Sequence, residues 1–269
     1  MFSPYYAWSG RTEPTDHTAL NVALYSPGQY RWTMTERRAS ALVRERRTCA
    51  IGPSRLDWSD DGLRIDIDEV AAPLPRRVRG RIRLFPEVLT DRPFELAEGG
   101  RHNWWPLAPR ARVEVAFDDP GLSWRGSGYL DTNYGAEPLE AGFSRWDWSR
   151  CDLGDGAAVL YDGVRRDGSP FSLGLRFDKT GRAELVAPPP AVDLARAPIW
   201  RMPRRTQAEN GEAAVCRTLE DTPFYARSVV GMRVFGERTM AVHESLSLDR
   251  FSLPIVKFML PFRMPRTFR

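Results

Sequence analysis

In two short segments, a residue that can donate or accept a proton stands close to an aromatic residue. Tyr129 and Asp131 stand two positions apart in YLDTN, and His102 and Trp104 stand two positions apart in RHNWW. Residues two apart in an extended strand point to the same face. A carboxyl group buried among aromatic rings has a raised pKa and can act as a general acid, and a neutral imidazole can accept or relay a proton.

Each of these residues also has a purely structural interpretation. Asp131 precedes Asn133, Tyr134 and Gly135, so its side chain could instead accept hydrogen bonds from backbone N–H groups of a turn. The Tyr129 ring could be part of a packed wall, and a lone histidine such as His102 is more often structural than catalytic. The residue types alone leave both interpretations open.

The segments that must position these groups have the pattern of strands. Apolar and polar residues alternate in LRIDIDEV, RVEVAF and FSLGLRF, and Asp-Gly turns separate such segments at short intervals. We therefore expect an all-β chain of two barrel-like antiparallel units, residues 1–119 and 120–269, that share a hydrophobic ligand cleft. One large sandwich is the alternative.

Two segments depart from this pattern. Residues 35–47 predict a short helix, because Thr35 could cap it, Glu36 would lie in its first turn and arginines follow toward its end. The C-terminal segment FSLPIVKFMLPFRMPRTFR combines apolar residues with Lys257 and three arginines. It predicts either a peripheral contact with a membrane surface or a last strand packed on the barrel.

Composition and charge exclude several classes of protein. The net charge is +4, but acidic residues are interleaved with the arginines, so the continuous basic stripe of a nucleic-acid-binding protein is missing. Three widely spaced cysteines without a CxxC pair predict neither a disulfide framework nor a zinc site, and His17 and His243 are interpreted as structural, so no metal is expected. No stretch approaches the roughly 20 apolar residues of a spanning helix.

Tryptophan is unusually frequent, with nine residues in the chain. Large rigid indole rings are suited to the walls of an apolar ligand site, although they pack equally well in a core. The candidates for substrate-binding walls stand in RHNWW, in the WRGSG segment just before YLDTN, and in RWDWSR: Trp105, Trp124, Trp146 and Trp148.

These motifs resemble the carotenoid 1,2-hydratase (hydroxyneurosporene synthase) family over the whole length of the chain. The most specific parts are GSGYLDTNYG, the following RWDWSR, and RHNWW; FSPYYAWSGR, TPFYARS and VHESLSLDRF agree as well. The resemblance implies two lipocalin-like domains and a carbon–oxygen lyase that needs no cofactor. It also implies addition of water to the C1–C2 double bond of acyclic carotenoids such as neurosporene and lycopene, at the cytoplasmic side of the bacterial inner membrane or in the cytoplasm.

For that reaction the resemblance assigns a role to each of the four residues. Asp131 would protonate the alkene, Trp104 would stabilise the tertiary carbocation, and Tyr129 or His102 would hold or activate the water. Two other functions remain possible for the same scaffold. One is a lipocalin-like carrier that binds a carotenoid unchanged, and the other is a pericyclase, which would need shape and hydrogen bonds but no buried acid.

Overall fold

The computed structural model of the chain describes residues 3–267, and these form two compact units. The first unit comprises Met1–Pro86, Ala111–Gly128 and Lys257–Arg269, and the second comprises Glu87–Arg110 and Tyr129–Val256. Two long strands, β9 (His102–Asp119) and β10 (Leu122–Gly135), pass from one unit into the other. The expected boundary between residues 119 and 120 lies in the turn that joins these strands, and the division into domains 1–119 and 120–269 stays a prediction.

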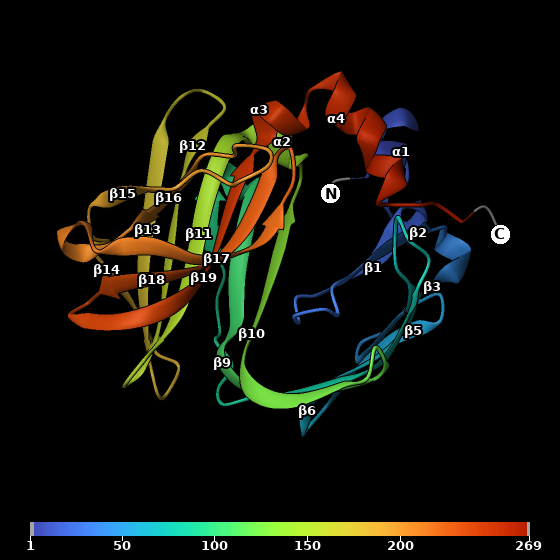
Figure 1. Cartoon of the computed structure of the whole chain (residues 1–269), viewed down its shortest axis with the longest axis horizontal. Helices are drawn as coiled ribbons and strands as arrows, with labels where there is room; N and C mark the ends of the chain where they lie inside the picture. The colour runs from blue at the N-terminus through green and yellow to red at the C-terminus, as the bar shows by residue number, and fades with distance from the viewer. Residues whose placement is uncertain (1–2, 268–269) are drawn as a thin grey trace. The chain divides into compact units, whose positions relative to one another are not determined.

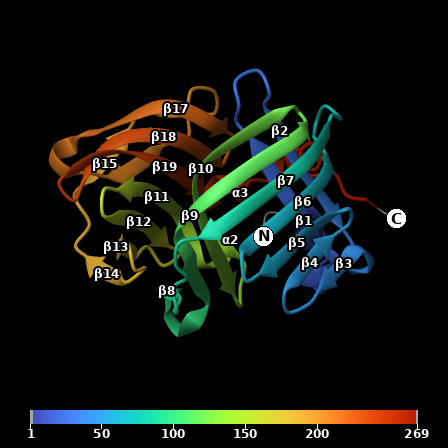
Figure 2. The same ribbon diagram turned by 90° about the horizontal axis from the view of Figure 1, so that it is seen from below.

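The first unit is built on an antiparallel sheet in which β3, β4, β5, β6 and β7 pair in chain order and β7 then pairs with β9 (Figure 2). A separate hairpin of β1 and β2 belongs to the same unit. Its strands are β1 Thr18–Leu24, β2 Arg31–Arg37, β3 Leu42–Arg44, β4 Thr48–Ile51, β5 Ser54–Ser59, β6 Gly62–Val70 and β7 Arg77–Pro86. Its helical segments are α1 Pro4–Trp8, three 3-10 turns (Pro14–Asp16, Ala39–Ala41 and Leu260–Phe262) and the end of α4, Pro254–Met259.

Alternation along the strands divides this sheet into an apolar and a charged face. On β7, Val78 is fully buried while Arg77 and Arg79 on either side are exposed. Val78 packs in one cluster with Ile67 of β6 and Val115 of β9. The period of two thus places the apolar side chains against a core and the arginines in solvent.

The helix expected over residues 35–47 is wrong. Strand β2 continues to Arg37, which pairs with Thr18 of β1, and only one short 3-10 turn precedes β3. Thr35 and Glu36 are 8% and 1% exposed, so both side chains are buried in the interior. Pairing with β1 gives the backbone of this segment its hydrogen bonds. The free energy gained from this long-range pairing outweighs the local charge pattern that favours a helix.

The second unit is built on a seven-stranded antiparallel sheet in the order β14-β13-β12-β11-β19-β18-β17 (Figure 1). The hairpin of β15 and β16 accompanies it, and β8 pairs with the beginning of β9. The strands are β8 Phe94–Ala97, β11 Phe143–Leu153, β12 Gly156–Arg165, β13 Pro170–Asp178, β14 Ala183–Val186, β15 Ala191–Leu194, β16 Arg204–Gln207, β17 Ala213–Asp221, β18 Tyr225–Val234 and β19 Glu237–Ser247. Short helical segments are α2 Leu139–Gly142, α3 Leu248–Phe251, the beginning of α4, and two 3-10 turns, Glu98–Gly100 and Glu209–Gly211.

The two faces of the seven-stranded sheet differ in chemistry. Leu160 of β12, Cys151 of β11 and Val230 of β18 lie in the apolar core on one face. Trp148 of β11 and Tyr161 of β12 are paired directly opposite each other, and both belong to the other face. Because strands alternate, the RWDWSR segment sends its tryptophans to one face and its aspartate to the opposite one.

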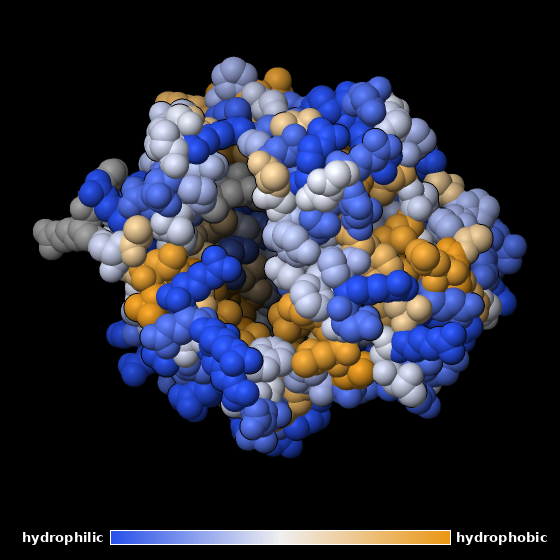
Figure 3. Space-filling view, turned by 180° about the vertical axis from the view of Figure 1, so that it is seen from behind, coloured by the Kyte–Doolittle hydropathy of each residue, from blue (hydrophilic) through white to orange (hydrophobic). Residues whose placement is uncertain are grey.

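The chain is therefore all-β with large antiparallel sheets, as expected. The pairing among residues 3–267 leaves open edges, so closure into barrels stays a prediction. Most of the C-terminal segment forms α4 and a 3-10 turn, and beyond them Arg266 makes only an isolated bridge with Glu36, so the alternative of a last strand there is wrong. None of the helices in residues 3–267 is long and apolar enough to cross a membrane. Apolar side chains also reach the surface between hydrophilic ones (Figure 3), and Phe258 and Phe262 are each 65% exposed.

Candidate active site

Strands β9 and β10 bring the four candidate residues together in two pairs within the second unit. His102 and Trp104 alternate with the less buried Asn103 and Trp105 on β9, and their exposed fractions are 4% and 1%. Tyr129 and Asp131 lie two apart on β10. The strand period predicted from the sequence therefore gives each pair a common face.

The carboxyl group of Asp131 accepts two hydrogen bonds, and both end on the same oxygen. The indole Nε1 of Trp104 donates to Asp131 Oδ2 at 2.8 Å, and the hydroxyl of Tyr129 donates to the same atom at 3.1 Å. Neither bond uses Oδ1. In the protonated acid, Oδ2 can therefore be the carbonyl oxygen with two donors, while Oδ1 holds a proton that is free to leave.

The surroundings favour the protonated form of this acid. Burial is the largest effect and raises the pKa of Asp131, and the negative charge of Glu244 raises it further. The hydrogen bonds from Trp104 and Tyr129 stabilise the carboxylate and act in the opposite direction, as does the charge of Arg227. The net shift is upward, so the group is a better proton donor near neutral pH than an exposed aspartic acid.

Aromatic rings surround this carboxyl group. The Tyr161 ring meets the Trp104 ring edge-on at 5.7 Å between centroids and the Trp146 ring at 5.5 Å. The Tyr129 ring lies 5.4 Å from that of Trp148. Trp146 and Trp148, predicted as substrate walls, are thus packed into the same cluster as the acid. Their electron-rich faces can stabilise a nearby cation.

Sequence reasoning missed Tyr161 and Glu244. Tyr161 is 5% exposed, and burial together with the charges of Asp131 and Glu244 raises its pKa above the ordinary value of tyrosine. Glu244 lies opposite Trp148 in the ladder between β11 and β19. Both belong to strands whose sequences show no motif that distinguishes these two residues. Only the pairing of β12 and β19 with β11 brings them close to the acid.

His102 lies in a separate pocket of side chains. Its Nε2 is 3.1 Å from Oε1 of Glu137, and its ring centroid is 4.8 Å from that of Phe143. Burial lowers the pKa of His102, while the charge of Glu137 acts against that effect. The imidazole is therefore poised to be neutral and able to accept a proton. No hydrogen bond within residues 3–267 joins it directly to Asp131.

Gly142 makes room for the His102 ring, and Gly135 makes room for the backbone of the preceding residue, Arg101. A Cβ on Gly142 would lie 2.3 Å from Nε2 of His102, and a Cβ on Gly135 would lie 2.2 Å from the backbone oxygen of Arg101. Such distances are far shorter than van der Waals contact. The glycines at these positions therefore follow from close approach and not from turn geometry.

The two remaining predicted substrate-binding residues have other surroundings. Trp105 donates its indole N–H to the Thr90 hydroxyl at 2.9 Å, on the face of β9 opposite to Trp104. Trp124 belongs to the first unit and is 46% exposed. Neither contributes to the cluster around Asp131 within the second unit.

Asp147 is buried on the opposite face of the seven-stranded sheet. Its carboxyl group accepts hydrogen bonds from Ser245 and from Arg145, the latter at 3.0 Å, and burial raises its pKa to about 7. His243 lies in the same region, where its Nε2 is 2.8 Å from the backbone oxygen of Arg205 and burial lowers its pKa to about 4. This cluster is separated from Asp131 by the sheet.

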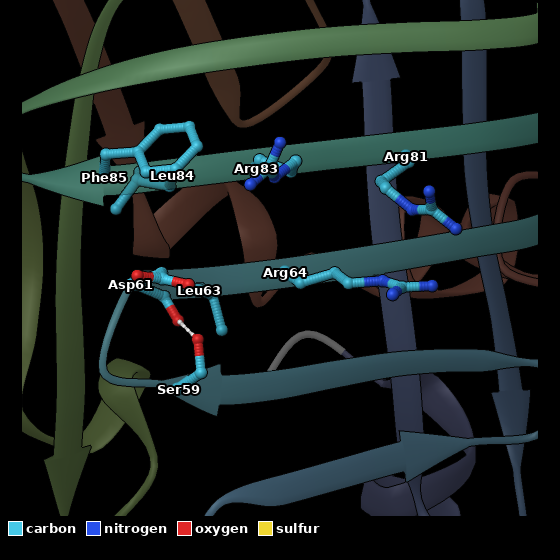
Figure 4. A pocket seen from close by; sticks show the side chains of 9 residues that line it. Ser59, Asp61, Leu63, Arg64, Arg81, Arg83, Leu84 and Phe85 are labelled. Atoms are coloured by element: carbon cyan, nitrogen blue, oxygen red, sulfur yellow. Dashed lines mark hydrogen bonds between the residues drawn. The ribbon is translucent and has the colours of Figure 1, made fainter.

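A pocket of about 270 Å³ lies elsewhere, on strands β5, β6 and β7 of the first unit (Figure 4). Its lining contains Arg64, Arg81 and Arg83 beside Leu84 and Phe85, and none of the candidate residues. A charged lining of this kind does not suit an apolar ligand. Among residues 3–267, no three His, Cys, Asp or Glu side chains are grouped as metal ligands.

Comparison with solved structures gives a likeness of fold. A protein from Nitrosomonas europaea with the provisional name AttH superposes with a TM-score of 0.54 at 15% identity, over 84% of this chain and 80% of the other. At this identity the likeness concerns the fold alone. It agrees with the all-β architecture described above.

Comparison of sequences gives much closer relatives. A protein of Thiocapsa roseopersicina named acyclic carotenoid 1,2-hydratase is 53% identical over 99% of this chain and 67% of its own length. A protein of Cereibacter sphaeroides with the same name is 45% identical over 99% of this chain and 95% of its own length. The family model "Carotenoid hydratase CrtC" matches residues 1–269. The chain, with its buried acid held between a tryptophan and a tyrosine, belongs to the carotenoid hydratase family CrtC.

Proposed function

We propose that this protein is an acyclic carotenoid 1,2-hydratase, a carbon–oxygen lyase that adds water to the C1–C2 double bond of neurosporene, lycopene and their derivatives. The observation that carries the proposal is the acid itself: both hydrogen bonds to Asp131 end on Oδ2, and aromatic rings surround it. An isolated alkene is a weak base, so its hydration needs a strong, desolvated proton donor. The names of the close relatives support the choice of substrate.

In the first step Asp131 transfers its proton from Oδ1 to C2. The π bond breaks, a C–H bond forms at C2 and a tertiary cation forms at C1. Trp104 and Tyr129 hold the carboxyl group in place and stabilise the carboxylate that the transfer leaves behind. General acid catalysis of this kind contributes about 10²–10⁴ in rate.

In the second step water adds to C1 and gives the tertiary alcohol. Before it is captured, the cation can be stabilised by the rings of Trp104, Trp146 and Trp148, by about 1–2 kcal/mol for a desolvated indole. His102, neutral and beside Glu137, is suited to relay protons with solvent. The net reaction adds one hydrogen and one hydroxyl group and transfers no electrons, so it requires no redox cofactor.

The same proposal includes the architecture that family members are expected to share. Two lipocalin-like barrels, residues 1–119 and 120–269, would enclose the long apolar substrate, with Trp105 and Trp124 along its path in addition to Trp146 and Trp148. The likeness to the Nitrosomonas europaea protein supports the fold but no ligand.

A membrane-dissolved substrate also needs a route to the protein, and α4 is suited to provide it. Ile255 and Phe258 are 62% and 65% exposed on this helix, and Phe262 follows in the next turn. Lys257 and Arg263 stand among them. Exposed apolar side chains combined with cations favour an anionic bilayer surface. We propose a peripheral location at the cytoplasmic side of the bacterial inner membrane, with the cytoplasm as the alternative.

The decisive experiment is product analysis after incubation of the purified protein with detergent-dispersed lycopene or neurosporene in ¹⁸O-labelled water. The wild type is expected to give a hydroxylated product with the label in the new alcohol, and Asp131→Asn is expected to give none above background. Asp118→Asn, at an exposed position, is the control and should match the wild type. Carotenoid bound but unchanged by the wild type would indicate a carrier, and a product without added water would indicate a pericyclase.

A further inference from the structure

A row of four side chains crosses the middle of the seven-stranded sheet. Trp148 on β11 pairs directly with Tyr161 on β12 and with Glu244 on β19, and Glu244 pairs with Arg227 on β18. Directly paired residues share a face and have Cβ atoms about 4.5–5.5 Å apart. The four side chains therefore lie next to one another on one face.

This row lies on the side of the sheet where the acid is. The Trp148 ring packs on Tyr129 and the Tyr161 ring packs on Trp104. Tyr129 and Trp104 are the two residues that hold Asp131. The negative charge of Glu244 also raises the pKa of both Asp131 and Tyr161, as expected for groups that face a common space.

Trp148 has a hydrogen-bond donor that the described residues do not use. The side chain is 8% exposed, and its indole Nε1 is buried without a partner within residues 3–267. Buried donors are nearly always satisfied by protein or by water. An N–H group of this kind can donate to the oxygen of one water molecule.

Glu244 supplies the matching acceptor. The guanidinium of Arg227 donates to its Oε1, and the side chain of Glu244 is 17% exposed. Arg227 is itself positioned by its Nε, which donates to the Tyr225 hydroxyl at 2.8 Å. The ion pair holds the Glu244 carboxyl group in a half-buried place, where a carboxylate can accept a proton from water.

We propose that Trp148 and Glu244 hold the water molecule that attacks the carbocation. The indole N–H of Trp148 donates to the water oxygen, and the carboxylate of Glu244 accepts one of its protons. As the oxygen–carbon bond forms at C1, the oxygen–hydrogen bond to that proton breaks and the proton passes to Glu244. Asp131 has by then given its proton to C2, and proton exchange with solvent returns both carboxyl groups to their starting state.

This assignment rests on the proposed hydratase activity, so its test must separate the two steps. In D₂O, Asp131 delivers deuterium to C2. C2 of the cation then carries one hydrogen and one deuterium. If capture by water is slow, the C–H bond at C2 breaks in a part of the molecules, the proton returns to the carboxylate, and the regenerated alkene keeps the deuterium. Deuterium in recovered lycopene therefore reports protonation, and hydroxylated product reports capture.

The variants are Glu244→Gln, Trp148→Phe and, as a matched control, Glu184→Gln, which changes an exposed glutamate on β14. We expect Glu244→Gln, assayed on the acid side of the pH–rate profile where Asp131 stays protonated, to form product about 10²-fold more slowly while deuterium in recovered lycopene persists or increases. Trp148→Phe should act in the same direction by about 10-fold, and Glu184→Gln should match the wild type. Circular dichroism and the melting temperature check that each variant is folded, and Glu244→Ala replaces Glu244→Gln if the latter is not.

Two results would overturn the assignment. One is a folded Glu244 variant that forms product at the wild-type rate. The other is a variant that loses product and deuterium together, as Asp131→Asn should, because Glu244 would then act on protonation. Failure of the proposed function itself looks different, since the wild type would then hydrate neither lycopene nor neurosporene.

Discussion

The indole N–H of Trp104 and the carboxyl group of Asp131 are joined across strands β9 and β10 by a hydrogen bond of 2.8 Å to Oδ2. This bond orients the acid, and it also stabilises the carboxylate, so it holds the pKa of Asp131 below the value that burial alone would give. The proposed catalytic acid therefore combines a fixed geometry with a pKa that is raised less than burial alone would raise it.

Removal of these hydrogen bonds should shift the pH dependence of activity. Asp131 must be protonated to donate, so the rate falls as pH rises through its pKa. Tyr129→Phe and Trp104→Phe each remove a donor to Oδ2 and raise that pKa, so the alkaline limb of the pH–rate profile should move to higher pH. The rate at the optimum should fall about 10-fold as orientation is lost. Trp105→Phe is the control, because it removes only a hydrogen bond to Thr90 and should leave the alkaline limb at the wild-type pH. An alkaline limb that does not move in either test variant would contradict the assignment of Asp131 as the acid.

We expect the space beside the His102 ring to be essential for stability and for activity. Gly142→Ala places a methyl group 2.3 Å from Nε2 of His102, so the imidazole must move away from Glu137. We expect a loss of about 1–3 kcal/mol in the free energy of unfolding and a lower kcat. Gly121→Ala is the control, because nothing lies within 4 Å of its added Cβ. Equal stability and activity of the two variants, measured by thermal unfolding and product formation, would show that the ring does not need this space.

Asp147 should make stability depend on pH. Its pKa is raised from 3.8 to about 7 in the folded protein, so the folded state keeps a proton that the unfolded state has lost between about pH 4 and 7. Stability from this residue is therefore lost as pH rises through that window. As pH rises from 4.5 to 7.5, the free energy of unfolding of Asp147→Asn should therefore increase by about 1–3 kcal/mol relative to that of the wild type. A difference between the two melting curves that does not change with pH would argue against a protonated Asp147.

The exposed side chains of Phe258 on α4 and of Phe262 in the following 3-10 turn should bind membranes. Phe258→Ser combined with Phe262→Ser removes apolar surface while Lys257 and Arg263 remain, and sedimentation with vesicles that contain phosphatidylglycerol should then fall about 10-fold or more. Leu185→Ser is the control, because Leu185 is 64% exposed on β14, away from this helix in sequence. Binding that survives the double substitution would remove α4 from the contact.

The sequence by itself determined the local facts about this protein. The alternation of residues predicted strands, and the spacing of two predicted that Tyr129 shares a face with Asp131 and His102 with Trp104. The motifs around them predicted the family, which the comparisons confirm. These inferences hold because side-chain direction within a strand and motif identity depend only on residues close in the chain.

Only the tertiary structure decided which strands lie next to one another. The pairing of β11 with β12 and β19 put Tyr161 and Glu244 beside Trp148, and neither residue stands out in its own segment. The same long-range pairing turned residues 31–37 into a strand, although the charges after Thr35 favour a helix. Strand register is set by burial and hydrogen bonds summed over distant segments, so no local pattern contains it.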